Sequence, residues 1–106
     1  MDLVTDIYTM TNTFPKSEQY GLVSQMRRAS VSIPSNIAEG SRRKTKKDFC
    51  QFVVVAFGSR AELETQIEIA KRLNYIKEKS YKNTDMLLDE IMRMLNKLIA
   101  SLRTTN

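Results

Sequence analysis

The fold of this chain is decided by residues 22–40, which read Leu22-Val-Ser-Gln-Met-Arg-Arg-Ala-Ser-Val-Ser-Ile-Pro-Ser-Asn-Ile-Ala-Glu-Gly40. The apolar residues of this segment recur at steps of four, three, four and four, at Leu22, Met26, Ala29, Ile33 and Ile37. That spacing places all of them on one side of a helix. The segment therefore predicts a single helix with one buried stripe.

Three residues define the limits and the irregularity of this helix. We expect it to begin near Lys16 or Ser17 and to end at Gly40, with the glycine as a left-handed C-terminal cap. Pro34 lies inside the pattern, where it cannot donate a hydrogen bond to the carbonyl group of Ser30. We therefore expect a kink at Pro34, and a break into two shorter helices is the alternative.

The segments on either side also have helical periodicity. Apolar residues recur at helical spacing from Leu3 to Met10, and the pattern stops at residues 12–15, so a first helix of about 12 residues is expected. Thr45 followed by Asp48 has the spacing of a capping box and predicts a third helix over about 46–73. Residues 74–80 form the last loop, and the fourth helix has a nearly regular four-three spacing at Thr84, Leu88, Ile91, Leu95, Leu98 and Leu102. Together these elements predict an all-α fold: one domain over residues 1–106, folded as an antiparallel up-down-up-down four-helix bundle.

Composition excludes several classes of chemistry. The 106 residues include no histidine and one cysteine, so a serine–histidine triad, a histidine-containing zinc site and an internal disulfide cannot form within the chain. Cys50 lies in an apolar run and is interpreted as a buried small hydrophobe. Glu62 and Glu64 point to different sides of a helix and cannot act on one atom. We therefore expect no metal, no cofactor and no catalysis.

The sequence also favours a cytoplasmic location. No apolar run approaches the roughly 20 residues that span a bilayer. The first residues, Met1 to Asp6, are acidic and lack the basic region of a signal peptide. The absence of a disulfide framework fits a reducing cytosol.

The segment 42–47, Arg-Arg-Lys-Thr-Lys-Lys, has five basic residues in six positions, and the whole chain has a net charge of +5. Arg27 and Arg28 lie three to four helical turns earlier. Cations gathered on a loop can neutralise phosphates and bind RNA or DNA mainly without reading the sequence. The predicted nucleic-acid-binding residues are Arg27, Arg28, Arg42, Arg43, Lys44, Lys46 and Lys47. The alternative is a solvated loop whose cations stabilise the preceding helix C-terminus.

A polar row lies beside the apolar stripe of the second helix and consists of Arg28, Ser32, either Ser35 or Asn36, and Glu39. A similar row on the third helix contains Ser59, Glu62 and Gln66. If the two rows face each other, they form a hydrogen-bonded network within the bundle or between subunits. Gly58 and Ser59 are interpreted as a close-packing point within a continuous helix.

Several motifs resemble those of one bacterial family. They are Gln25-x-Arg-Arg-Ala, Ser32-Ile-Pro-Ser-Asn-Ile-Ala-Glu-Gly40, Phe49-x-x-Phe52, Ala56-x-Gly-Ser59, Glu62-Leu-Glu-Thr-Gln66 and Ala70-x-x-Leu-x-Tyr75. These motifs are similar to those of the four-helix-bundle proteins linked to 23S rRNA intervening sequences, from about Tyr8 to Leu102. Relative to the usual family pattern, the chain starts late in the first helix, so the earliest turns are expected to be absent.

This resemblance implies a four-helix bundle that assembles as a ring-like homopentamer. It also implies kinship with the accessory variability protein of diversity-generating retroelements, a basic pentamer that binds nucleic acid and a reverse transcriptase. The leading hypothesis is therefore a non-enzymatic oligomer that presents a basic surface to RNA or DNA, as an accessory to a larger nucleic-acid enzyme. A protein-interaction scaffold without nucleic-acid binding is the alternative.

Overall fold

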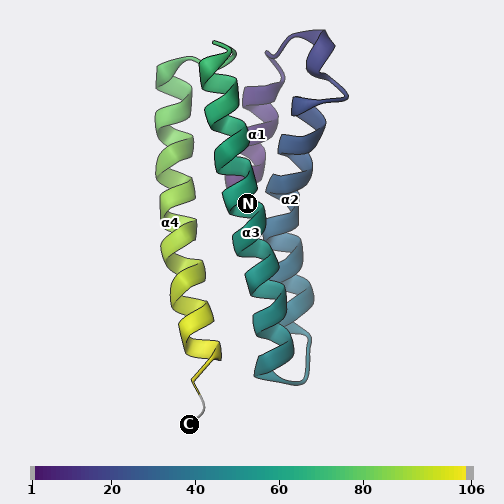
Figure 1. The fold of residues 1–106 in the computed structure, drawn as a ribbon, viewed down its shortest axis with the longest axis vertical. Coiled ribbons are helices and arrows are strands. Elements are labelled where there is room, and N and C mark those ends of the chain that lie inside the picture. Colours follow the sequence, from purple (N-terminus) through teal and green to yellow (C-terminus); the bar gives the residue numbers. More distant parts are fainter. Residues whose placement is uncertain (1, 105–106) are drawn as a thin grey trace.

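The structure is a computed structural model, and it describes residues 2–104. It contains four α-helices and one short 3₁₀ helix: α1 (Asp2–Thr11), η1 (Lys16–Glu18), α2 (Leu22–Ser41), α3 (Lys46–Arg72) and α4 (Glu78–Leu102). Successive α-helices run in opposite directions along an elongated bundle of 49 × 24 × 19 Å (Figure 1). The predicted all-α four-helix bundle is confirmed.

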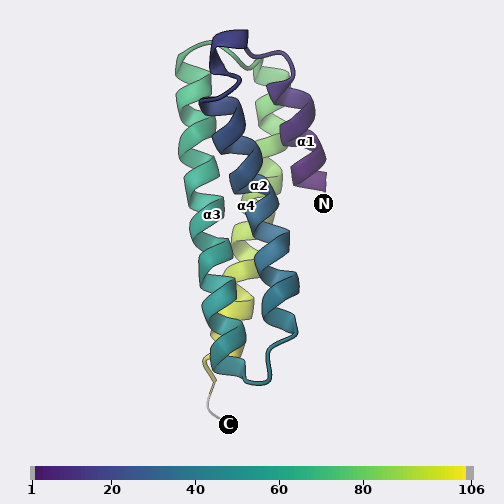
Figure 2. The same cartoon turned by 90° about the vertical axis from the view of Figure 1, so that its right-hand side faces the viewer.

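Helix α1 is much shorter than the other three helices. Its 10 residues compare with 20, 27 and 25 residues in α2, α3 and α4. Two perpendicular views show α1 beside α2 and α4 in only one half of the bundle, the half that contains η1 (Figures 1 and 2). The other half, which contains the α2–α3 loop and the end of α4, is built from three helices.

The core forms where the apolar stripes of the helices meet. Met26, Ala29 and Ile33 of α2 are buried, as the four-three spacing predicted. The α3 stripe contributes Val53, Ala56, Leu63, Ile67 and Ala70, all at most 1% exposed. On α4, Thr84, Leu88 and Leu95 are buried, whereas Leu98 and Leu102 are only half-buried, in the part of the bundle that α1 does not cover. None of the helices within residues 2–104 combines the length and apolarity needed to cross a bilayer.

The beginning of α2 differs from the sequence prediction. The helix starts at Leu22, not near Lys16 or Ser17. Lys16–Glu18 instead form the separate turn η1, and Gly21 then takes a non-helical conformation with φ −110° and ψ −106°. The apolar stripe starts at Leu22 and Val23, so the preceding polar turn has no face to bury against the core.

Pro34 and Gly40 both lie inside α2. The helix is continuous from Leu22 to Ser41, so the alternative of two shorter helices is wrong, and the kink stays a prediction. Gly40 is not a left-handed cap, because none of the glycines has a positive φ. Gly40 is buried, and a Cβ atom added to it would lie 2.6 Å from Cβ of Phe52 and 2.9 Å from Cδ1 of Phe49. The glycine is therefore required for close packing of α2 on α3.

The ends of α3 follow recognisable capping rules. Thr45 precedes α3, and its Oγ1 accepts a hydrogen bond from the Asp48 backbone N–H at 3.1 Å, which confirms the predicted N-cap. At the other end Asn74 has φ 60°, and the Tyr75 backbone N–H donates to the Ala70 carbonyl at 3.0 Å. This is the Schellman arrangement, with asparagine at the left-handed position. α4 then begins at Glu78, slightly earlier than predicted.

Candidate functional site

The predicted basic cluster is fully on the surface. Residues 42–45 connect α2 to α3, and residues 46 and 47 form the first turn of α3. Arg42, Arg43, Lys44, Lys46 and Lys47 are all exposed. The Thr45 cap fixes where the loop ends and α3 begins, so the structure presents the five cations at one tip of the bundle (Figure 1).

The end of α4 adds cations to the same tip. Leu102 and Arg103 share an open pocket of about 550 Å³ with Lys46 and Lys47 of α3. We define the basic end as residues 39–48 together with residues 97–103. This part of the molecule has seven lysine and arginine residues against two carboxylates, whereas the rest of the chain has ten of each. The entire net charge of +5 is therefore located at one end of an elongated molecule.

Most of these cations have no acidic partner. Among residues 2–104, Arg43 is the member of the 42–47 cluster that forms an ion pair, with Glu39 at 2.7 Å. Its guanidinium also lies 4.6 Å from the centre of the Phe52 ring, which holds the side chain against α3. The other four cations of the cluster are exposed and form no ion pair with any residue that the structure describes, and so they remain available to an anionic partner.

Sequence reasoning missed Arg103 and Lys97 as members of the basic end. Lys97 lies near the end of α4 and Arg103 directly follows it, 50 or more residues from the cluster in the chain. An up-down-up-down topology places the end of the fourth helix beside the start of the third. The predicted fold was therefore sufficient to identify these two cations as neighbours of the 42–47 cluster.

Arg27 and Arg28 do not join the basic end. They lie near the beginning of α2, in the half of the bundle that α1 covers. Arg27 Nε donates to Thr11 Oγ1 at 2.9 Å, and its guanidinium lies 4.6 Å from the centre of the Tyr8 ring. Arg28 is exposed. The seven predicted nucleic-acid-binding residues therefore fall into two separate groups.

The predicted polar rows do meet across α2 and α3. The hydroxyl groups of Ser32 and Ser59 are 2.8 Å apart, and Asn36 Nδ2 donates to Ser32 Oγ at 2.9 Å. This is a hydrogen-bonded network within one chain. A role for these residues in contacts between subunits stays a prediction.

Three other members of the rows, Glu39, Glu62 and Gln66, bond to residues four positions away in the chain. Gln66 is buried and donates from Nε2 to Glu62 Oε1 at 3.1 Å, whereas Glu39 pairs with Arg43. A Cβ atom added to Gly58 would meet nothing within 4 Å. Gly58 is therefore not a packing point within the chain, although its neighbour Ser59 is.

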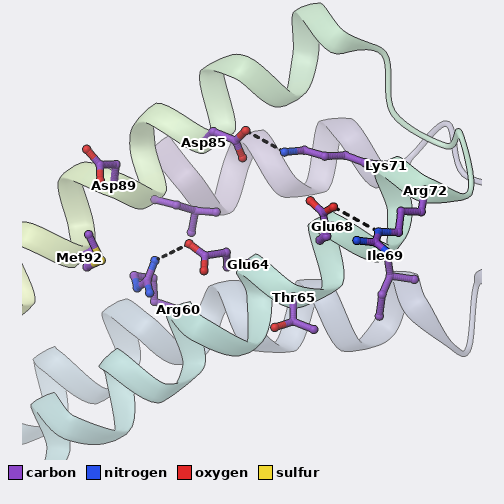
Figure 3. A pocket seen from close by; sticks show the side chains of 11 residues that line it. Arg60, Glu64, Thr65, Glu68, Ile69, Lys71, Arg72, Asp85, Asp89 and Met92 are labelled. Atoms are coloured by element: carbon purple, nitrogen blue, oxygen red, sulfur yellow. Dashed lines mark hydrogen bonds and ion pairs between the residues drawn. The ribbon is translucent and has the colours of Figure 1, made fainter.

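Another pocket lies between α3 and α4 and has a volume of about 620 Å³ (Figure 3). Each of its three cations has a carboxylate partner: Arg60–Glu64 at 3.1 Å, Lys71–Asp85 at 2.8 Å and Arg72–Glu68 at 3.3 Å. Asp89 is a fourth acidic residue of the lining. Because acidic groups outnumber basic ones here, this pocket does not favour an anion.

Arg60 is the unexpected residue of that pocket. It is only 5% exposed, and its Nε has no hydrogen-bond partner among the described residues. The sequence contained a signal for its burial, since Ala56, Arg60 and Leu63 continue the four-three spacing of the core stripe. Arg60 is a buried charge that belongs to the packing between α3 and α4.

Comparison with known proteins supports the resemblance. Residues 1–97 match the family described as 23S rRNA-intervening sequence protein. No curated protein matches the sequence. A solved structure from Bacteroides thetaiotaomicron, described as a protein with unknown function from the S23 ribosomal protein family, superposes with a TM-score of 0.79. The two chains are 23% identical, and the match covers 91% of this chain and 87% of the other, so the likeness shows a shared fold. Neither description names an enzymatic activity, and on the match over residues 1–97 the chain belongs to the 23S rRNA-intervening sequence protein family.

Proposed function

We propose that this chain is a non-enzymatic, cytoplasmic homo-oligomer that binds RNA or DNA through its basic end, as an accessory to a larger nucleic-acid enzyme. The observation that carries the proposal is the location of the net charge. All of the +5 lies at one end of the molecule, and four cations of the 42–47 cluster have no ion pair within residues 2–104.

The chemistry of such a surface is that of phosphate binding. Each lysine or arginine that contacts a phosphate releases a condensed counterion, and this release favours binding without reading the base sequence. Two short stretches of chain supply the seven cations, and the rigid helices α3 and α4 hold them together. A phosphate backbone that crosses the tip can therefore contact several of them at once.

We further propose that the oligomer is a ring of five copies, as the family resemblance implies. Large exposed apolar side chains support association, since Val55 is 53% exposed, Met86 65% and Met94 68%. A ring with its subunits aligned would place several basic ends side by side. Affinity for a long nucleic acid would then rise through multiple attachment, without any new type of contact.

The test is the salt dependence of binding to RNA and DNA, measured by fluorescence anisotropy. One variant changes the five cations of the cluster to glutamine: Arg42, Arg43, Lys44, Lys46 and Lys47. A matched control removes the same charge from the opposite end of the bundle by changing Lys16, Arg72, Lys77, Lys79 and Lys82 to glutamine. Because all ten changed residues are exposed and none is in the core, we expect both variants to fold.

For the native chain we expect a steep loss of affinity with rising salt. Each phosphate contact contributes about 0.7–0.9 to the slope of log K against log [salt]. The cluster variant should reduce this slope by roughly one for each cation that it removes from a phosphate contact. The control variant should keep most of the slope of the native chain. Absence of binding at low salt, or equal losses in the two variants, would reject the proposal in favour of a protein-interaction scaffold. Light scattering tests the oligomer separately, and a monomer at micromolar concentrations would reject the ring.

A further inference from the structure

A second positively charged pocket lies between α1 and α2, away from the basic end. It has a volume of about 420 Å³, and it brings together Tyr8 from α1, Tyr20 from the turn before α2, and Arg27 and Arg28 from α2. The other lining residues are Gln19, Val23, Ser24 and Val31, so no carboxylate is among them. We call this site the Tyr–Arg pocket. Pockets of this size accommodate small ligands or single residues of a larger one.

Arg27 is held in a fixed position in this pocket. Its Nε donates to Thr11 Oγ1 at 2.9 Å and its Nη2 donates to the Tyr8 carbonyl at 3.4 Å. Thr11 is itself anchored, because its hydroxyl donates to the Ile7 carbonyl at 2.7 Å. The guanidinium lies over the Tyr8 ring, with Cζ 4.6 Å from the ring centre. The result is a preorganised pair of one aromatic ring and one cation, so little conformational entropy remains to be lost on binding.

Tyr20 is the most exposed large hydrophobic side chain in the part of the chain that the structure describes, at 96%. Other tyrosines have structural contacts: Tyr75 bonds to Glu18 and packs on Phe14, and Tyr81 lies below Lys71. The Tyr20 side chain buries almost none of its surface within the chain, so burial of this ring contributes little to stability. An aromatic ring that borders an acid-free cationic pocket is a suitable platform for a flat ligand.

We propose that the Tyr–Arg pocket binds an unpaired base of a single-stranded nucleic acid. Tyr20 stacks on the base, the Arg27–Tyr8 pair supplies the second polarisable surface, and exposed Arg28 contacts a neighbouring phosphate. Aromatic side chains and arginine planes bind bases in this way in single-strand-binding proteins. Bases inside a duplex are stacked on each other and cannot enter the pocket. This inference rests on the proposed function and adds to it a preference for single strands.

The first experiment compares an oligothymidylate of about 12 nucleotides, within the range that single-stranded sites cover, with an abasic strand of equal length. The two ligands have equal charge, and they differ only in the bases. The native chain should bind the oligothymidylate more tightly by about 5- to 150-fold, the range for one stacked base. Tyr20→Ala should remove this preference, and Tyr20→Phe should keep it. The control Leu73→Ala truncates another exposed apolar side chain, at the end of α3, and should leave both affinities unchanged.

A second readout uses the absence of tryptophan from the chain. Tyr20→Trp introduces a single tryptophan, and its fluorescence should be quenched by the oligothymidylate but not by the abasic strand. Equal affinity of the native chain for the two strands would overturn the inference while leaving phosphate binding at the basic end intact. Binding of neither strand would overturn both proposals. A loss of oligomerisation in Tyr20→Ala with an unchanged base preference would assign Tyr20 to a contact between copies and would also overturn the inference.

Discussion

Two glycines of this chain should respond in opposite ways to the same substitution. Gly40→Ala places a Cβ atom 2.6 Å from Cβ of Phe52 and 2.9 Å from Cδ1 of Phe49, well inside the optimal carbon–carbon separation of about 3.5–4.0 Å. The Phe52 Cβ is close to the backbone and cannot rotate away, so α2 and α3 must move apart. In Gly58→Ala the new Cβ meets nothing within 4 Å.

The expected magnitudes follow from these geometries. Gly58 lies in the middle of α3, where alanine is more favourable than glycine by about 0.5–1 kcal/mol. Gly58→Ala should therefore raise the melting temperature by a few degrees. Gly40→Ala gains part of the same helical preference but introduces overpacking that costs about 1–3 kcal/mol. The free energies of unfolding of the two variants should differ by roughly 1–3 kcal/mol, with Gly40→Ala the less stable.

The assay is urea unfolding followed by far-ultraviolet circular dichroism, at one protein concentration for all variants. If Gly40→Ala is as stable as Gly58→Ala, then the close packing of α2 on α3 at Phe52 is wrong. If Gly58→Ala is destabilised and also dissociates an oligomer, then the open space at Gly58 is occupied by another copy of the chain.

Three further predictions concern the core and the η1 end of the bundle. Ala56→Asp buries an unpaired charge at a site with 0% exposure and should unfold the bundle. The control Ala100→Asp places the same charge at an exposed site and should leave the bundle folded. Equal melting curves for the two variants would refute the assignment of Ala56 to the core. Arg60→Met removes a buried charge whose Nε has no hydrogen-bond partner among the described residues. The free energy of unfolding should therefore stay equal or rise by about 1 kcal/mol. A clearly lower melting temperature of the variant would show that the charge is needed for stability. The hydrogen bond of Tyr75 to the Glu18 carboxylate raises the pKa of Tyr75 above its ordinary value of 10.0, and burial acts in the same direction. Since the raised pKa belongs to the folded state, the contribution of this hydrogen bond to stability is complete below pH 10 and disappears as the pH rises through the raised pKa. The difference between the absorbance titrations of the native chain and of Tyr75→Phe should be one tyrosine with a pKa above 10, and a difference centred at 10 or below would contradict this contact.

The sequence was sufficient to predict the helices and most of the core residues, because both depend on local periodicity. Met26, Ala29 and Ile33 are buried as their spacing required, and Thr45 caps α3 as its distance from Asp48 indicated. The role of Gly40 could not be read in the same way. A glycine at the end of a periodic segment resembles a cap, and only the packing of α2 on α3 shows that the rings of Phe49 and Phe52 exclude a side chain.

The candidate sites also differ in whether their residues are neighbours in the sequence or only in the fold. The cluster 42–47 is contiguous in the chain and was therefore evident, whereas Arg103 joins it only through the antiparallel arrangement of α3 and α4. Arg27 was identified as a cation, but its partner Tyr8 is 19 positions away and belongs to another helix. A combination of aromatic and basic residues from separate segments is a property of the fold, and no local pattern contains it.

The location of all net charge at one end also affects how the molecule meets a partner. A rod 49 Å long with its charge at one tip has a large permanent dipole moment along its axis. In the field of an anionic polymer such a rod turns before contact, so that productive encounters are mainly end-on. Rising ionic strength shortens the distance over which this orientation acts, to about 10 Å at 0.1 M salt. Salt should consequently slow association more than it accelerates dissociation, and stopped-flow kinetics would separate the two rates.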